Sequence, residues 1–228
     1  MLSFLFDNID SILILDTETS GLSPRTNQII ELAALKLIRQ NGEMVIAEQM
    51  DDFIHLPKGQ LLDPKVVELT HITDQMLHEE GLEEEAVLNK FVKMFAGERT
   101  MMVAYNAHFD MSFLYYSLAR YGLAQNLKGV TMLDALTVYK DRRPYPHRLE
   151  NAIEEYPLQD KVVNSHRAID DTLALKEVLI AMEQECNDLH CYKNLFGYNP
   201  KFGVNGARIS SVTYKPQAYD CPMKLYEL

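Results

Sequence analysis

The fold is decided by the stretch SILILDTETSGL, which covers residues 11–22. Its apolar part, Ile12 to Leu15, is typical of a buried strand, and the strand ends in two carboxylates, Asp16 and Glu18. Residues two apart on a strand point to the same face, so these carboxylates are expected side by side. Their charge is compensated by a metal ion, a basic side chain, a helix N-terminus or solvent. The stretch has no lysine or arginine, and its two carboxylates would form half of a site for a hard cation such as Mg²⁺.

The composition bounds the class of protein. A chain of 228 residues, 47% hydrophobic and 24% charged, is long enough for one domain, or one and a half, with a core of ordinary size. Its 22 basic and 33 acidic residues give a formal net charge of 22 − 33 = −11. Because bulk charge of this sign repels phosphates, any grip on nucleic acid must come from local basic residues and bound metal.

The cysteines and the N-terminal residues bear on the compartment. The cysteines match no zinc spacing and fit a reducing, intracellular setting: Cys186, Cys191 and Cys221. The first six residues are apolar, but Asp7 and Asp10 interrupt the run and no basic segment precedes it. We therefore expect no signal peptide, no membrane span and a cytoplasmic location.

The order of the elements predicts an α/β fold. Apolar runs predict four further strands, over residues 28–38, 44–56, 101–105 and 130–133. The second and third strands are joined by Asn41-Gly42, the strongest hairpin signal in the chain. The expected sheet is therefore mixed and five-stranded, with three antiparallel strands, then two parallel ones, and helices on both faces.

Helices and a change of character complete the outline. Helical spacing covers residues 83–96, 106–121, 135–140, 149–155 and 166–186. Asn106 is expected to cap the second of these helices, and Asn164-Ser165 the last. Glycines and prolines then break the pattern, leaving one isolated strand over 209–214. We expect one domain over 1–186 and an extension of unknown function, 187–228, that packs on it.

Four acids occupy comparable positions along the chain. Asp16 and Glu18 end the first strand, Asp110 follows the fourth, and Asp171 lies one to two turns into the long helix. Sites in open α/β sheets gather at the carboxyl ends of the strands. Carboxylates brought there from separate segments repel one another unless cations intervene, and two divalent ions are the usual arrangement for phosphoryl chemistry. Oxygen ligands select magnesium or manganese over zinc.

Three motifs occur in order: DTETSGL at 16–22, YNAHFD at 105–110 and HRAIDD at 166–171. Together they resemble the DnaQ-like, or DEDDh, family of 3′–5′ exonucleases, which has a ribonuclease H-like fold. IIELAA at 29–34 and LTHIT at 69–73 add to the match, whereas Tyr105 stands where many members carry histidine. The pattern is most similar to the proofreading exonuclease of PolC-type DNA polymerase III, and the resemblance covers about residues 11–183.

The resemblance implies a role for the acidic residues and the histidine of these motifs. Asp16, Glu18, Asp110 and Asp171 would hold two Mg²⁺ or Mn²⁺ ions, and His166 would be the general base. Independently, an imidazole with a pKa near ~6.5 suits the deprotonation of water at neutral pH. If both were helical, His166 and Asp171 would be about 140° apart, so we expect His166 at the loop edge of the helix, free to swing.

The resemblance also places three segments at the 3′-terminal nucleotide. The backbone of Thr17 and the side chain of Asn106 are expected to contact it. The segment around His71 is expected to lie beside it, although His71 itself is also typical of a loop or packing residue. Leu22 either packs against a base or closes the core, with neither alternative favoured. Glu31 is expected to be structural, bonded to nearby backbone.

Phosphate contacts are the least constrained part of the prediction. By default such charged side chains are simply solvated. The best candidates for phosphate contacts are Arg167 and the one basic run near the third motif, which consists of Arg142, Arg143, His147 and Arg148. Asp170 is expected to be a solvated acid and His108 a surface residue near the site. The aromatic residues of the tail are expected to pack it onto the domain rather than to stack bases.

The predicted activity is metal-dependent removal of nucleotides from the 3′ end of single-stranded DNA, releasing nucleoside 5′-monophosphates. One alternative keeps the chemistry but acts on RNA, as RNase T and oligoribonuclease do. A second is a proofreading subunit that works only with a polymerase partner. A third is a binding module that has lost catalysis, against which the complete set of four acids and a histidine speaks.

Overall fold

Five strands form one mixed sheet in the order β3-β2-β1-β4-β5. The structure is a computed structural model that describes residues 3–6, 8–163, 165, 167–219 and 223–228. The strands are β1 (Ser11–Thr19), β2 (Ile29–Gln40), β3 (Glu43–Phe53), β4 (Thr100–Ala104) and β5 (Thr131–Asp134). β1, β2 and β3 run antiparallel in sequence, whereas β4 and β5 run parallel to β1. The predicted ribonuclease H-like sheet is confirmed.

The hairpin between β2 and β3 forms because Asn41 and Gly42 both adopt positive φ angles, 53° and 86°. Two left-handed residues in succession make the turn whose twist matches that of the flanking strands. The hairpin closes with Gln40 opposite Glu43 and carries β3 along the whole of β2. The hairpin sets the register of the sheet edge farthest from the parallel strands.

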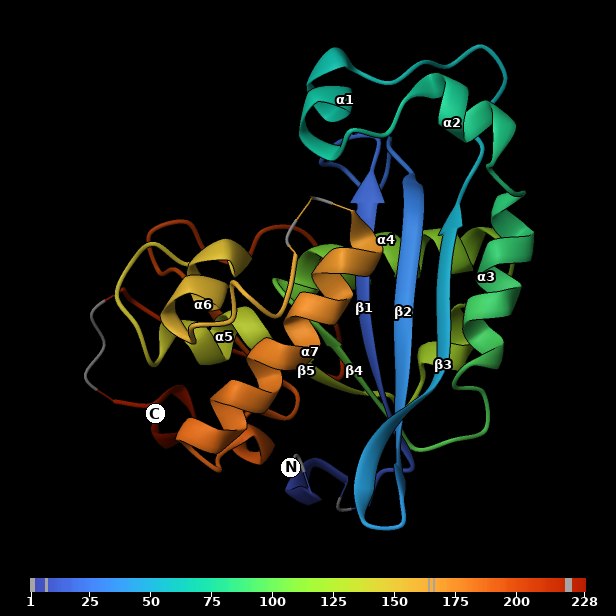
Figure 1. Cartoon of the computed structure of the whole chain (residues 1–228). Coiled ribbons are helices and arrows are strands. Elements are labelled where there is room, and N and C mark those ends of the chain that lie inside the picture. Colours follow the sequence, from blue (N-terminus) through green and yellow to red (C-terminus); the bar gives the residue numbers. More distant parts are fainter. Residues whose placement is uncertain (1–2, 7, 164, 166, 220–222) are drawn as a thin grey trace.

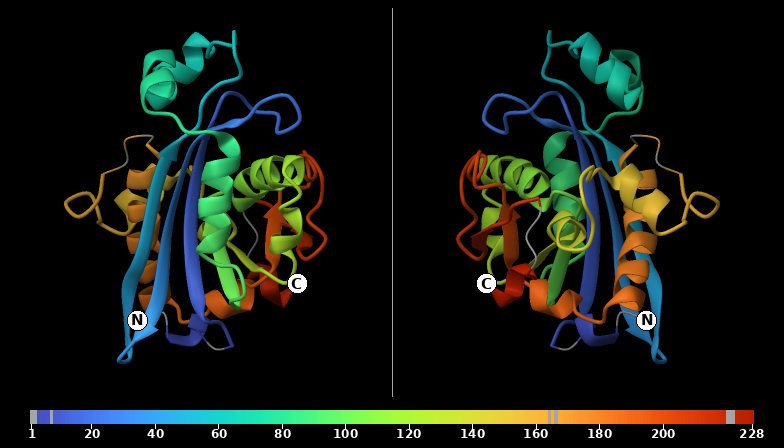
Figure 2. Two further views of the ribbon diagram at one scale, coloured as in Figure 1. Left: turned by 90° about the vertical axis from the view of Figure 1, so that its right-hand side faces the viewer. Right: turned by 90° about the vertical axis from the view of Figure 1, so that its left-hand side faces the viewer.

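Helices cover both faces of the sheet (Figures 1 and 2). Alternate residues of β1 divide between two cores, because successive side chains of a strand point to opposite faces. Ile12 and Ile14 pack in one core with α5, α6 and α7, and Leu13 and Leu15 in the other with α3 and α4. These helices are α3 (Glu84–Lys93), α4 (Ala107–Arg120), α5 (Ala135–Lys140), α6 (Leu149–Glu155) and α7 (Ala168–Glu185). None of the helices in the described ranges is long and apolar enough to cross a bilayer.

Two short helices lie above the carboxyl end of β1 (Figure 1). They are α1 (Pro64–Thr70) and α2 (Asp74–Glu79). The Asp63 carboxylate caps the first of them and the Thr73 hydroxyl the second, through the Lys65 and Met76 backbone N–H groups. A small apolar cluster that includes Ile30 fastens this segment to β2. These helices therefore form a wall at the edge of the sheet where the sequence predicts the site.

One predicted helix cap is confirmed in position and the other is wrong. Asn106 is the N-cap residue of α4, but its φ of 66° is left-handed and its side chain makes no capping hydrogen bond. The long helix begins at Ala168 rather than at 166, with Arg167 before it. Asn164 lies outside the described residues, and the Ser165 hydroxyl donates to the Asp170 carboxylate at 2.5 Å. This contact also corrects the prediction that Asp170 is merely solvated.

The last part of the chain contains a second sheet that the sequence did not predict. It consists of β6 (Leu195–Tyr198) and β7 (Thr213–Pro216), which run parallel. The single strand expected over 209–214 is wrong, because only its last two residues are extended and they pair with β6. Asn194 fastens this sheet to β5, because its side-chain amide oxygen accepts a hydrogen bond from the Met132 N–H at 2.7 Å. Short 3-10 helices lie at Ser3–Phe6, Ala124–Leu127, Leu189–Tyr192 and Leu225–Glu227.

Candidate active site

Three carboxylates meet at the carboxyl end of β1. Asp16 and Glu18 project to the face of the sheet that α7 covers, and Asp171 reaches them from that helix. Each offers one oxygen atom, and the three oxygens all lie within 4.8 Å of one another. The structure therefore brings together three of the four acids that the sequence singles out, from elements that are far apart along the chain.

The start of α7 is fixed by Glu31, a fully buried residue of β2 that lies opposite Glu18. Its Oε2 accepts a hydrogen bond from the Ala168 N–H at 3.0 Å, and its Oε1 accepts from Arg167 Nε at 2.8 Å. A carboxylate at a helix N-terminus also complements the helix dipole. The predicted bonding of Glu31 to backbone is confirmed, and the contact sets the position of Asp171 one turn further on.

Asp171 has one buried oxygen atom without a partner. It is 8% exposed, and its Oδ1 has no hydrogen-bond partner among the described residues. A buried polar atom left unpaired costs about 1–3 kcal/mol, more when it is charged. The Ser165 backbone N–H also reaches this carboxylate. Asp16 and Glu18 lie beside it, and a proton or a cation between the three groups would relieve the unpaired oxygen. The donors are all oxygens, which is the set that Mg²⁺ and Mn²⁺ prefer.

The electrostatics of the group follow from burial and mutual repulsion. Burial, then the charges of Asp171 and Glu31, raise the pKa of Glu18 to about 8. Burial raises the pKa of Asp171 to about 7, with Asp170 as the next cause. Burial and the nearby Asp110 raise the pKa of Asp16 well above its usual range. Without a cation, these groups therefore hold protons at neutral pH that an unfolded chain would release.

The fourth acid, Asp110, is buried in the first turn of α4 on the other side of β1. Its Oδ1 accepts hydrogen bonds from the Thr17 hydroxyl at 2.7 Å and the Thr17 N–H at 3.1 Å. Burial nevertheless raises its pKa to about 7. Asp110 therefore borders the group of three, but one of its oxygens is already bound by the residue between Asp16 and Glu18.

Asp134 positions α4, a role that the sequence reasoning missed. Its Oδ1 accepts from the Ala107 N–H at 3.0 Å and from the Leu136 N–H at 3.2 Å, and its Oδ2 from the Thr137 hydroxyl at 2.6 Å. One buried carboxylate thus anchors the starts of both α4 and α5. An aspartate directly before a helix with threonine three residues on is the usual pattern of an N-cap, and that pattern was the available signal.

His166, the predicted general base, lies outside the described residues. Of the residues predicted to contact nucleotide, Leu22 is 86% exposed and lines the same hollow as Asn106. His71 ends α1 with a left-handed φ of 59° and is exposed. The Thr17 N–H is bonded to Asp110 as described above. The structure thus places Leu22 with Asn106, and His71 on the wall above β1.

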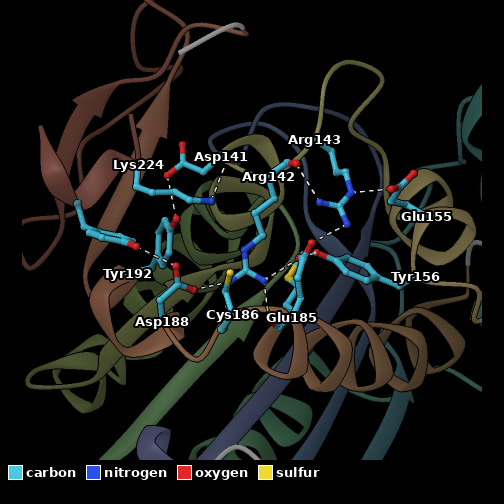
Figure 3. Close-up of polar contacts among 12 residues, drawn as sticks. Asp141, Arg142, Arg143, Glu155, Tyr156, Glu185, Cys186, Asp188, Tyr192 and Lys224 are labelled. Atoms are coloured by element: carbon cyan, nitrogen blue, oxygen red, sulfur yellow. Dashed lines mark hydrogen bonds and ion pairs between the residues drawn. The ribbon is translucent and has the colours of Figure 1, made fainter. Parts of the chain in front are cut away.

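Two residues of the basic run, Arg142 and Arg143, are engaged in ion pairs (Figure 3). The Arg142 side chain is 1% exposed and binds Asp188 and Glu185, so its predicted phosphate contact is wrong. Arg143 binds Glu155 and Glu185, both at 2.7 Å. These pairs fasten the loop after α5 to α6 and to the end of α7.

The other basic candidates differ in how free they are. His147 is buried, with its ring stacked on Tyr219 at 5.7 Å between centroids. Arg167 pairs with Glu31 at 2.7 Å. Only Arg148, whose side chain is 82% exposed, extends into solvent, with Glu150 at 3.3 Å. His108, expected to be a surface residue, is instead half-buried against the last part of the chain, where its Nδ1 lies 2.9 Å from the Tyr214 hydroxyl.

Comparison with known proteins relates the chain to exonucleases and polymerases. The family model RNase_T, described as "Exonuclease", matches residues 13–179. DNA polymerase III PolC-type of Staphylococcus aureus (strain bovine RF122 / ET3-1) is 34% identical over 177 residues, which is 78% of this chain. The PolC-type polymerase of Halalkalibacterium halodurans is 36% identical over 180 residues, 77% of this chain. This chain spans only 12% of the length of each of these two relatives.

Solved structures share the fold at lower identity. Exonuclease I from Methylocaldum szegediense has a TM-score of 0.68 and 20% identity, over 79% of this chain and 42% of that one. E. coli Exonuclease I in complex with a dA16 oligonucleotide also has a TM-score of 0.68 and 20% identity, over 80% of this chain and 42% of that one. At this identity the likeness establishes the α/β fold alone.

Proposed function

The chain belongs to the exonuclease family whose model spans residues 13–179, and from this premise we propose that it is a metal-dependent 3′–5′ exonuclease acting on DNA. It would release nucleoside 5′-monophosphates one at a time. The observation that carries the proposal is the approach of three carboxylate oxygens to within 4.8 Å, one of them from the buried and partly unsatisfied Asp171. Such a group is tenable at neutral pH only with protons or cations between its members.

The residues present fit divalent metal. Asp16, Glu18 and Asp171 supply an oxygen-only set, and Asp110 borders it. We assign these four side chains to two Mg²⁺ or Mn²⁺ ions. When bound, two such ions supply an activated nucleophile and stabilise the leaving oxygen of a phosphodiester.

The remaining roles belong to the chain's own residues. His166 is assigned as the general base that takes the proton from the attacking water, since an imidazole titrates near neutral pH. Leu22 and Asn106 are assigned to the 3′-terminal nucleotide, supported by the hollow that both of them line. His71 on the wall above β1 and the backbone of Thr17 are assigned to the opposite side of that nucleotide.

DNA is the proposed substrate because the two sequence relatives described above are named as DNA polymerases. We assign residues 1–186 to the exonuclease domain and residues 187–228 to an extension of it. Arg148 is the proposed phosphate contact of the basic run, because it is the exposed member. Arg167 is also proposed as a phosphate contact. Because it pairs with Glu31, a phosphate would have to bind it in addition to that carboxylate.

The test is an assay of the purified chain alone with Mn²⁺ on matched DNA and RNA oligonucleotides labelled at the 5′ end. We expect a ladder of products shortened from the 3′ end and free nucleoside 5′-monophosphates, with faster turnover of DNA. Faster turnover of RNA would overturn the substrate, and activity that appears only after addition of a polymerase would overturn the independent enzyme.

A matched pair of variants tests the metal assignment. Asp171→Asn should lower turnover by more than the roughly 10–100-fold typical of a change outside the metal ligands. Asp170→Asn, which alters the neighbouring carboxylate that Ser165 binds, should cost much less. Calorimetric titration with Mn²⁺ gives an independent readout: wild-type protein should take up metal, and unchanged uptake by Asp171→Asn would contradict the assignment.

A further inference from the structure

We propose that two adjoining hollows along α4 bind the nucleic-acid strand on the 5′ side of the scissile bond. This surface, the α4 groove, begins at Leu22 and Asn106 and runs along α4. The inference rests on the proposed function and specifies how that function grips its polymer. It commits to one occupant, a single strand that continues from the 3′-terminal nucleotide.

The α4 groove begins at two residues that are assigned above to the 3′-terminal nucleotide. Its first hollow, of about 500 Å³, is lined by Leu22, Asn106 and the loop up to Arg25. Its second hollow, of about 560 Å³, lies beyond it toward the 3-10 helix at 124–127. The two hollows share Ser112, Tyr116 and Ala207 in their linings. A strand whose 3′ end lies at Asn106 would therefore enter the second hollow by passing Tyr116.

The charge of the α4 groove is opposite to that of the protein. The chain carries a net charge of −11, yet the linings of both hollows contain no aspartate or glutamate. They contain three exposed cations instead: Arg25, Lys128 and Arg208. By contrast, the hollow beside α2 is lined by Asp74, Glu83 and Glu84 among others.

None of these three cations forms an ion pair with the residues that the structure describes. In the part of the chain that the structure describes, ion pairs engage six of the nine arginines: Arg99, Arg120, Arg142, Arg143, Arg148 and Arg167. The three that they do not engage are Arg25, Arg39 and Arg208, and two of these line the α4 groove. Such local cations are what an acidic protein needs in order to hold a polyanion.

Aromatic rings accompany the cations. Tyr115 is 53% exposed in the lining of the second hollow. Arg25 Nε donates to the Tyr116 hydroxyl at 3.1 Å, and the Arg208 guanidinium lies 5.3 Å from the centre of the Tyr214 ring. Tyr115 is the exposed ring of the groove, Tyr116 is half-buried in its lining, and Tyr214 lies behind the lining. An exposed ring beside cations is a usual means of binding single strands without reading sequence, since every base has a face to stack.

The wall of the α4 groove is held in place by the last part of the chain, which runs beside α4 (Figure 2). His108 Nε2 donates to the Asn205 carbonyl, and its Nδ1 contacts the Tyr214 hydroxyl at 2.9 Å. The Tyr214 hydroxyl also accepts from the Ile209 N–H at 3.2 Å. Residues 205–209 are thus positioned against α4, which gives the extension a function: it completes the path of the strand.

The test compares substrates of two lengths in the full chain. Wild-type protein and a Lys128→Ala/Arg208→Ala variant are assayed with Mn²⁺ on a dinucleotide and on a long single-stranded oligonucleotide, over a range of salt. The dinucleotide has no phosphate other than the scissile one, so it offers none to Lys128 or Arg208. We expect the variant to raise KM for the long substrate and to reduce the slope of log KM against log salt by about 1.4, or ~0.7 for each lost phosphate contact on a single strand.

Two further variants separate binding from damage to the fold. Arg39→Ala removes the third unengaged arginine, which lies near the β2–β3 turn, and should leave the length dependence as in wild type. Tyr115→Ala should raise KM for the long substrate about 5-fold or more, whereas Tyr115→Phe, which keeps the stacking ring, should not.

The outcomes distinguish this inference from the function beneath it. If wild-type protein hydrolyses neither substrate, the proposed function fails. If it hydrolyses both but the double variant keeps the wild-type salt slope and KM for the long oligonucleotide, the α4 groove proposal is overturned. In that case the positive charge of the α4 groove would instead fit an acidic peptide.

Discussion

Thr17 holds Asp110: the hydroxyl of the residue between the two β1 acids lies 2.7 Å from the Asp110 Oδ1 atom, and its N–H lies 3.1 Å away. The alternation of the strand sends Asp16 and Glu18 to one face and Thr17 to the other. Three consecutive residues of β1 thus supply two members of the carboxylate group and fix the orientation of the fourth acid. Thr17 is therefore a positioning residue as well as a neighbour of the site.

Replacing Thr17 with valine tests this role. Thr17→Val keeps the shape but removes the hydroxyl donor, so the Asp110 carboxylate loses a charge-assisted hydrogen bond worth roughly 1.5–3 kcal/mol. We expect lower free energy of unfolding at pH 8 and weaker Mn²⁺ uptake by calorimetry. Thr19→Val, which removes a hydroxyl that donates only to the Gly21 carbonyl, is the control. Equal metal affinity in both variants would show that Thr17 does not orient Asp110.

Glu31→Gln tests the anchor of α7. The change removes the charge that binds Arg167 and accepts from the Ala168 N–H. Because the arginine is partly exposed, we expect a loss of about 1–3 kcal/mol rather than the larger cost of breaking a fully buried pair. Urea denaturation measures it, with Glu48→Gln on the exposed face of β3 as the control. Turnover should also fall, since Asp171 follows this anchor by one turn, and a variant as stable and active as wild type would refute the role.

The carboxylate group predicts how stability depends on pH. The pKa of Glu18 is raised to about 8 and that of Asp171 to about 7, against about 4 in an unfolded chain. Between these values the folded state binds more protons than the unfolded state, so the free energy of unfolding of metal-free protein falls as pH rises from about 4 to 8. The loss is complete above the folded pKa values.

Thermal unfolding of chelator-treated protein across this range measures the effect. Tm should fall with rising pH, Glu18→Gln should flatten the fall, and Mg²⁺ should raise Tm more at pH 8 than at pH 6 because fewer protons must then be displaced. A Tm that rises across the window in metal-free protein would contradict the raised pKa values.

Arg142→Ala tests the ion pairs around the end of α7 (Figure 3). The buried guanidinium binds Asp188 and Glu185 and donates to the Met182 carbonyl at 2.5 Å. Removing one partner of a buried pair leaves charge uncompensated and typically costs about 3–5 kcal/mol. Arg148→Ala, at an exposed arginine, should change stability by no more than about 0.5 kcal/mol. Similar unfolding midpoints for the two variants would show that the Arg142 pairs contribute nothing.

How much of the site was predictable depended on how local each signal was. Strand alternation makes Asp16 and Glu18 neighbours whatever surrounds them, and the Asn-Gly turn sets the first hairpin. The role of Asp134 was readable from its position before a helix but was overlooked. The engagement of Arg142 was not readable, because its partners lie more than forty residues further along the chain.

The sequence by itself determined the five-stranded mixed sheet, the exonuclease motifs and the acids at the end of β1, since these follow from local periodicity and short spacings. Only the tertiary structure decided which of the acids meet, which cations remain unpaired and where the last forty residues pack. The physical reason is that β6 is four residues long and contains a glycine, so its pairing with β7 and its attachment to β5 depend on contacts that no local pattern encodes.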